Sequence, residues 1–329
     1  MDHLKEVVRK LKSQSDLLYE AVFNDEKSAI KILVNSYETE LSTTIPYSFD
    51  GFERLISDSN MWATVAKNFE DKVCELTYKL IRIELIMILK ASKLYREKYY
   101  INFAPPDLSK KCDDYDLERQ CVQLFITRFG FNCLAVKELM NEGLAKFEAF
   151  ELSIGILLRS CLLDVSLIAC WNNKPEFLYH MASESLLPRN LPGHINQKDL
   201  NGFERLHNFY NPEKVRFEPK EVKKMLAALA PQLKKEFDEL YLYYSKYDHF
   251  SLIPILSRHS VRNQLRLTQR SIDLVRQFFF MLISRNSILP KEEFSDILGM
   301  REEVNDETGH YKLITVPALD LLSGTYKVI

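Results

Sequence analysis

The stretch LSIGILLRSCLLDVSLIAC at residues 152–170 decides the fold class predicted for this chain. Thirteen of its nineteen residues are apolar, and only Arg159 and Asp164 are charged. A run of this composition is typical of a helix that buries most of its circumference. Buried charges are costly unless they are paired and hydrogen-bonded, so each of these two side chains needs a partner.

The two charges are expected to face different neighbours. Five helical positions turn the chain by about 140°, so Arg159 and Asp164 do not share a face as residues four apart do. Each charge is therefore predicted to look towards a different helix. Polar side chains of two later stretches, 241–249 and 258–270, are the candidate partners.

The same stretch is long enough to cross a membrane, but its charges argue against that. Two mid-helix charges would each cost about 2.5–3.5 kcal/mol on insertion. The other apolar run, IRIELIMILK at 81–90, is too short and carries Arg82 and Glu84. The N-terminus MDHLKEVVRKLKSQSD has no apolar signal-peptide core. We expect no contact with a membrane and a cytoplasmic location.

Composition fits an ordinary globular protein with few tight turns. The chain has 329 residues, 46% of them hydrophobic and 27% charged, with a net charge of −2 and nine glycines. Scarce glycine disfavours Rossmann-like phosphate loops. The six cysteines have no CxxC spacing, which indicates reduced thiols in a cytosolic protein rather than a zinc site. We expect no cofactor.

Periodicity predicts an all-α multi-helix bundle with a small C-terminal β-hairpin or edge strand. The main helices are expected at about 60–99, 116–128, 131–150, 152–171, 231–248 and 257–287, with Gly130 and Gly143 as possible breaks. YKLITV (311–316) and TYKVI (325–329) have strand-like composition. The expected organisation is an N-terminal helical region at 1–104, a central bundle at 115–289 and a tail at 290–329.

Two stretches carry candidate binding or catalytic side chains. In YLYYSKYDHF (241–250), Tyr241, Ser245 and His249 are four residues apart and lie near one helical face. Histidine could transfer a proton near neutral pH. The alternative is a packed tyrosine stripe whose histidine has a structural partner.

The second stretch, SRHSVRNQLRLTQR (257–270), holds an arginine ladder. Its members recur every fourth residue: Arg258, Arg262, Arg266 and Arg270. Such guanidinium groups suit phosphate or carboxylate recognition, because each can bind an anion through two hydrogen bonds. The alternatives are a solvated face, or a ladder that pairs with acids of another helix.

ILLRSCLLDVSLIACW (156–171) followed by YLYYSKYDHFS (241–251) resembles a group of uncharacterised all-helical bacterial proteins distantly related to the HEPN superfamily. In that pattern one helix carries an arginine followed by an acid, and a later helix carries tyrosine, serine and histidine. The matching residues are Arg159, Asp164, Tyr241, Ser245 and His249. The acid usually stands four residues after the arginine, where this chain has Leu163.

Arg159, Asp164, Ser245 and His249 are expected to line a polar core pocket with the arginine ladder at its mouth, which favours an anionic ligand such as a nucleotide or RNA. The resemblance implies a role in phage defence or stress. If the protein is an enzyme, it would be a metal-independent ribonuclease. His249 would then be the acid/base, Arg159 or Arg258 would stabilise the phosphate charge, and Asp164 and Ser245 would complete the site. The alternative is a non-catalytic interaction or scaffold module. Its arginine ladder would pair with an acidic partner or with a second protomer in a homodimer.

Overall fold

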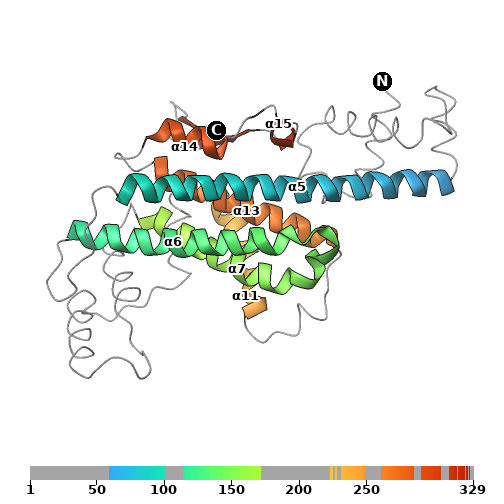
Figure 1. Ribbon diagram of the computed structural model, residues 1–329, viewed down its shortest axis with the longest axis horizontal. Coiled ribbons are helices and arrows are strands. Elements are labelled where there is room, and N and C mark those ends of the chain that lie inside the picture. The colour runs from blue at the N-terminus through green and yellow to red at the C-terminus, as the bar shows by residue number, and fades with distance from the viewer. Residues whose placement is uncertain are drawn as a thin grey trace.

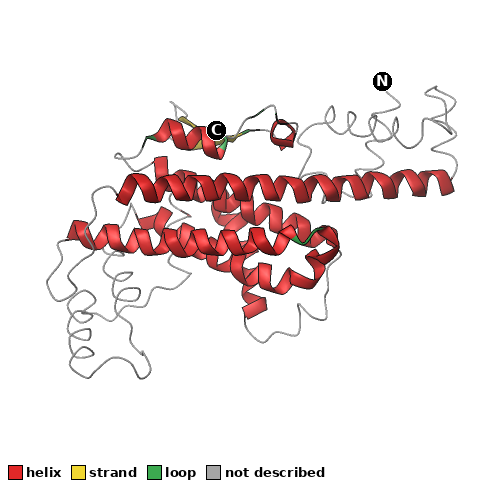
Figure 2. Cartoon of the chain, in the orientation of Figure 1, coloured by secondary structure: helices red, strands yellow, loops and turns green. Residues whose placement is uncertain are grey.

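The structure is a computed structural model that describes residues 59–100, 114–171, 231–248, 261–284, 290–304, 311–316 and 318–322, with single positions at 223, 224, 227, 324 and 326. Within these residues it contains seven helices and one two-stranded antiparallel sheet (Figure 2). The predicted all-α bundle with a small C-terminal β-hairpin is confirmed.

The elements follow one another along the chain with few described connections. In order they are α5 (Ser59–Tyr100), α6 (Asp114–Asn141), α7 (Leu144–Trp171), α11 (Pro231–Asp248), α13 (Val261–Ser284), α14 (Lys291–Leu298), β1 (Met300–Val304), β2 (Tyr311–Thr315) and α15 (Ala318–Leu322). The predicted bounds of α5 and α11 are correct to within one residue. The helix predicted at 152–171 is longer, because α7 begins at Leu144.

The long helix α5 divides the molecule. The C-terminal elements α14, β1, β2 and α15 lie on one side of it, and α6 and α7 lie on the other (Figure 1). Helix α13 packs against both α5 and α7, and α11 packs against α7 and α13. Three members of the arginine ladder, Arg262, Arg266 and Arg270, therefore lie on a helix that packs against several others.

The core forms around the apolar face of α13. Leu265, Ile272 and Val275 are fully buried there, as their spacing predicts. Phe279 packs against Phe129 of α6, with ring centroids 5.4 Å apart, and against Tyr95 of α5, with ring centroids 6.1 Å apart. These tilted aromatic contacts tie three helices to one point in the core.

The two candidate glycine breaks behave differently. Gly143 has a φ of 92° and lies between the end of α6 at Asn141 and the start of α7 at Leu144, and the two helices pack against each other. Gly130 is not a break, because α6 runs straight through it. A Cβ atom at Gly130 would lie 3.0 Å from Ser92 Oγ, so this glycine allows α6 to approach α5 closely.

The α6–α7 pair also brings two cysteines together. The Sγ atoms of Cys133 and Cys161 are 3.7 Å apart, too far for a disulfide bond, and both side chains are fully buried. Together with Cys74 they are free thiols. The predicted reduced core thiols are thus found at these three positions.

The C-terminal elements form a small unit on α5. The strand expected at 311–316 is confirmed as β2, and its partner is Met300–Val304, which the sequence pattern did not predict. Gly299 ends α14 with a φ of 61°, and its carbonyl accepts a 2.8 Å hydrogen bond from the Val316 amide. The strand expected at 325–329 falls largely outside the described residues, and Tyr326 lies in a bend.

One hydrophobic core joins all three expected regions. Buried residues of α5, from region 1–104, and of α14, from region 290–329, belong to the same cluster as those of α6, α7, α11 and α13. The expected boundaries near residues 104 and 289 fall on residues that are not described. In the described helices, none has the length and apolarity needed to cross a bilayer.

Candidate functional site

Arg159 of α7 reaches towards α11. Its Nη2 donates a 3.3 Å hydrogen bond to the hydroxyl of Tyr241, and its guanidinium carbon lies 5.3 Å from the centre of the same ring. Tyr241 is itself buried and stacks on Phe237 with ring centroids 5.3 Å apart. The partner expected for Arg159 within 241–249 is therefore present.

Asp164 reaches in the other direction, towards α6. Arg128 holds it through two hydrogen bonds, one from Nε to Oδ2 at 2.8 Å and one from Nη2 to Oδ1. Burial raises the pKa of Asp164 above its usual value, and Arg128 opposes that shift. Arg159 and Asp164 thus face different helices, as predicted, but the partner of Asp164 lies in neither of the expected stretches.

Of the other members of the predicted set, some are described and some are not. Ser245 donates a 2.8 Å hydrogen bond to the carbonyl of Leu242 within its own helix. His249, the expected acid/base, lies outside the described residues, as does Arg258. Arg262 belongs to α13, but its side chain is not described. Arg159 and Tyr241 are two described members that are in contact.

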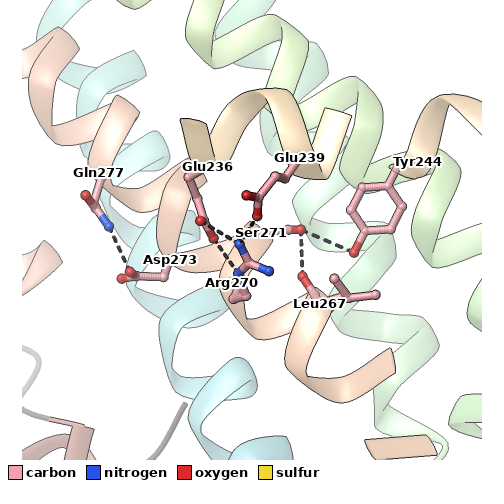
Figure 3. Close-up of polar contacts among 8 residues, drawn as sticks. All are labelled: Glu236, Glu239, Tyr244, Leu267, Arg270, Ser271, Asp273 and Gln277. Carbon is pink, nitrogen blue, oxygen red and sulfur yellow. Dashed lines mark hydrogen bonds and ion pairs between the residues drawn. The ribbon is translucent and has the colours of Figure 1, made fainter. Parts of the chain in front are cut away.

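The end of the arginine ladder pairs with acids of α11. Arg270 donates to Glu236 from Nε at 2.5 Å and from Nη2 at 2.6 Å, and its Nη2 also donates to Glu239 at 2.8 Å (Figure 3). Both acids raise the pKa of Arg270, with Glu236 the larger cause. For Arg270, therefore, pairing with acids of another helix is the correct interpretation.

A polar cavity lies beside this ion pair. Its volume is about 280 Å³, and it is bounded by α5, α11, α13 and the C-terminal unit. Its charged lining residues are Glu84, Glu236, Arg266, Arg270, Asp273 and Arg276. Two ladder residues, Arg266 and Arg270, thus line a cavity, although it is not the one predicted around α7. We name it the α13 cavity.

The inner end of the α13 cavity is a buried ion pair. Arg276 Nη2 lies 3.2 Å from Glu84 Oε1, and the two side chains are only 3% and 2% exposed. Arg276 Nη2 also donates to Asp273 at 2.8 Å. Exposure is greater at Arg270 and Glu236, at 23% and 32%, so these residues form the outer rim.

Burial changes the protonation of this inner pair. It raises the pKa of Glu84 to about 8, against the opposing effect of the nearby Arg276. Burial disfavours the Arg276 cation too, but Glu84 and Asp273 together hold the pKa of Arg276 above its usual value. Among the described residues, Glu84 Oε2 and Arg276 Nε have no hydrogen-bond partner. Such unpaired buried atoms are rare and costly.

Glu84 and Arg276 were not predicted as site residues, although the sequence carries a signal for both. Glu84 is the only acid in the apolar run 81–90. Arg276 stands four residues after Ile272 and three before Phe279, on the apolar face of α13. The argument applied to 152–170, that a buried charge needs a partner, applies equally to them.

The described residues hold no group of three or more histidine, cysteine or acidic side chains arranged to bind a metal ion. The α13 cavity is lined by guanidinium, carboxyl and amide groups. Comparison with protein-family models, with curated proteins and with solved structures finds no match for this chain.

Proposed function

We propose that this protein is a ligand-binding helical bundle that holds an anionic group of a small molecule in the α13 cavity. The observation that carries the proposal is that Arg266, Arg270 and Arg276 of one helix line a single cavity of about 280 Å³. Guanidinium groups bind carboxylates and phosphates through paired, charge-assisted hydrogen bonds. The cavity lies just below the range of ~300–1,000 Å³ typical of small-molecule sites, which favours a compact ligand.

Arg266 is the most informative position for a test. Arg270 holds two acids of α11 and Arg276 belongs to the buried pair, so substituting either would disturb the fold as well as the cavity. Arg266→Gln changes the charge at a half-buried lining position. Arg301→Gln is the matched control, because Arg301 is exposed on β1 and does not line the cavity.

The experiment is a thermal-shift titration of the full chain with inorganic phosphate, the nucleoside monophosphates, a short RNA and small carboxylic acids. A ligand at 100 times its dissociation constant stabilises the folded state by about 2.7 kcal/mol. At least one probe is expected to stabilise the wild type and Arg301→Gln. Arg266→Gln should bind that probe about 10- to 100-fold more weakly, as loss of a charge-assisted hydrogen bond implies. Equal binding by all three chains would reject the proposal.

A second candidate function is metal-independent RNA cleavage at the α7–α11 contact, in phage defence or stress. The observation that favours it is the 3.3 Å contact between Arg159 and Tyr241, two members of the HEPN-like pattern on different helices. His249 would act as the acid/base. The test is cleavage of an RNA oligonucleotide in the presence of a chelator. Cleavage that His249→Ala leaves unchanged would reject this role, and salt-insensitive RNA binding would remove the nucleic-acid proposal.

The non-catalytic interaction module remains the alternative to both. It is supported by the ion pairs that join neighbouring helices within the chain, Arg128–Asp164 and Arg270–Glu236. Such pairs can serve to fix how helices pack. This alternative predicts no saturable binding of any probe and no RNA cleavage.

A further inference from the structure

The lining of the α13 cavity carries groups of both signs. The carboxylates of Glu236 and Asp273 face three guanidinium groups, and Glu84, whose pKa burial raises to about 8, adds a third carboxyl group. A strongly anionic ligand would therefore meet repulsion as well as attraction at close range. A small ligand that carries one negative and one positive group matches the lining better.

The inner end of the cavity holds an acceptor next to a donor. Glu84 Oε2 and Arg276 Nε have no hydrogen-bond partner among the described residues, and the other oxygen of this carboxyl group lies 3.2 Å from Nη2 of the same guanidinium group. One ligand group that donates and a neighbouring group that accepts would satisfy both atoms. An α-amino acid presents a donor and an acceptor in this way, because its ammonium and carboxylate groups are both attached to the same α-carbon atom.

The lining also has an apolar part. It consists of Leu80 of α5, Leu274 of α13, and Val316, Ala318 and Leu321 of the C-terminal unit, and three uncharged polar residues, Gln269, Gln277 and Thr315, complete the lining. Leu80, Leu274 and Leu321 are at most 4% exposed. An aliphatic side chain placed against this wall would lose contact with water at no cost in unpaired polar groups.

We infer that the α13 cavity binds a free α-amino acid with an aliphatic side chain. Its ammonium donates to Glu84, its carboxylate accepts from Arg276 and the ladder arginines, and its side chain packs on Leu80 and Leu321. This inference rests on the proposed function, because the amino-acid carboxylate is the anionic group held by the arginines. It goes further in naming the positive group and the apolar wall.

The test is isothermal titration calorimetry of the full chain with three ligands of similar shape. L-leucine carries both charges, 4-methylpentanoate lacks the ammonium, and 3-methylbutylamine lacks the carboxylate. L-leucine is expected to bind the wild type at least tenfold more tightly than either analogue. Glu84→Gln should weaken the binding of L-leucine about 10- to 100-fold and leave the affinity for 4-methylpentanoate nearly unchanged. Glu292→Gln, an exposed change on α14, is the matched control.

Each outcome decides the question. The proposed contact between the ammonium group and Glu84 is rejected if 4-methylpentanoate binds the wild type as tightly as L-leucine does. It is also rejected if Glu84→Gln leaves the affinity for L-leucine unchanged. If phosphate or a nucleotide binds in an Arg266-dependent way and L-leucine does not, this inference fails while the proposed function stands. If no anion-bearing probe depends on Arg266, both fail. The comparison of the three ligands on the wild type decides the inference even if Glu84→Gln does not fold.

Proton release gives an independent readout. The pKa of Glu84 is raised to about 8 by burial, so an ammonium group beside this carboxyl would lower that pKa and expel a proton near pH 7. The measured enthalpy of L-leucine binding should then vary with the ionisation enthalpy of the buffer. A binding enthalpy that is the same in two buffers of different ionisation enthalpy, imidazole and Tris, would contradict contact of the ammonium with Glu84.

Discussion

Buried charges in this chain are held by partners on other helices. Arg128 binds Asp164 across α6 and α7, and Arg276 lies beside Glu84 across α5 and α13. The sequence could show that such charges needed partners, because each stands in an apolar helical run. It could not show which partner each would find, because the choice depends on how distant helices pack. Arg128, for example, was not predicted from the sequence as the partner of Asp164.

The Arg128–Asp164 pair predicts a stability effect. Arg128→Met should destabilise the chain by about 1.5–3 kcal/mol, because it leaves a carboxylate that is 1% exposed without its charged partner. The cost stays below the roughly 3–5 kcal/mol of fully buried pairs, since Asp164 can take up a proton. Urea denaturation at pH 7 measures it. Adding Asp164→Leu to Arg128→Met should recover part of the loss, and full additivity of the two changes would contradict the pairing.

Glu84 predicts a pH dependence. Its pKa is about 8 in the folded chain and near its ordinary value when unfolded, so the folded state binds the proton more tightly. Its contribution to stability is therefore complete at low pH and is lost as the pH rises towards about 8. The slope is at most about 1.4 kcal/mol per pH unit. Urea denaturation between pH 5 and 8 should show a shallower decline for Glu84→Gln, and parallel curves would contradict the shifted pKa.

Among the secondary-structure elements, periodicity predicted the helices well and the ends of α5 and α11 to within one residue, but it misplaced the boundary between α6 and α7. The apolar spacing of α5, α11 and α13 predicted all three helices. Gly130 was wrongly predicted as a possible helix break, because glycine is disfavoured within helices. It lies within α6 at the point where this helix is close to Ser92 of α5. β1 was missed because MREEV at 300–304 has few β-branched or aromatic residues, and its pairing with β2 sets its conformation.

The close approach at Gly130 predicts a conditional effect of alanine. In isolation, Gly130→Ala should favour α6 by about 0.5–1 kcal/mol through its helix propensity. The new Cβ would lie 3.0 Å from Ser92 Oγ, however, so the gain should be largely cancelled in the wild-type background. It should appear when Ser92→Ala removes the hydroxyl. A double-mutant cycle by thermal denaturation measures this coupling, and equal effects in both backgrounds would show that the two helices are not in close contact there.

At the scale of the whole molecule, one core links helices that the sequence assigned to different regions. Buried residues of α5, α13 and α14 belong to a single cluster. The C-terminal unit adds a second small cluster on α5, formed by Leu80, Met87 and Leu321. Leu80 and Leu321 also line the α13 cavity, so part of its lining depends on the packing of the C-terminal unit against α5.

A shared core predicts cooperative unfolding. Amide hydrogens in the buried parts of α5 and α13 should lose protection at the same denaturant concentration, because neither helix can leave the core without exposing the other. Hydrogen exchange followed by mass spectrometry, at increasing urea, measures this directly. Loss of protection in α5 well before α13 would indicate instead that the N-terminal region unfolds as a separate unit.

The α13 cavity is the central claim, and native mass spectrometry of the full chain tests it most directly. Wild type, Arg266→Gln and the control Arg301→Gln would each be incubated with one equimolar mixture of inorganic phosphate, AMP and L-leucine. The wild type and Arg301→Gln should each retain one molecule of the same anion-bearing ligand, and Arg266→Gln should release it. Equal retention by all three chains, or retention by none, would contradict a binding site formed by the arginines of α13.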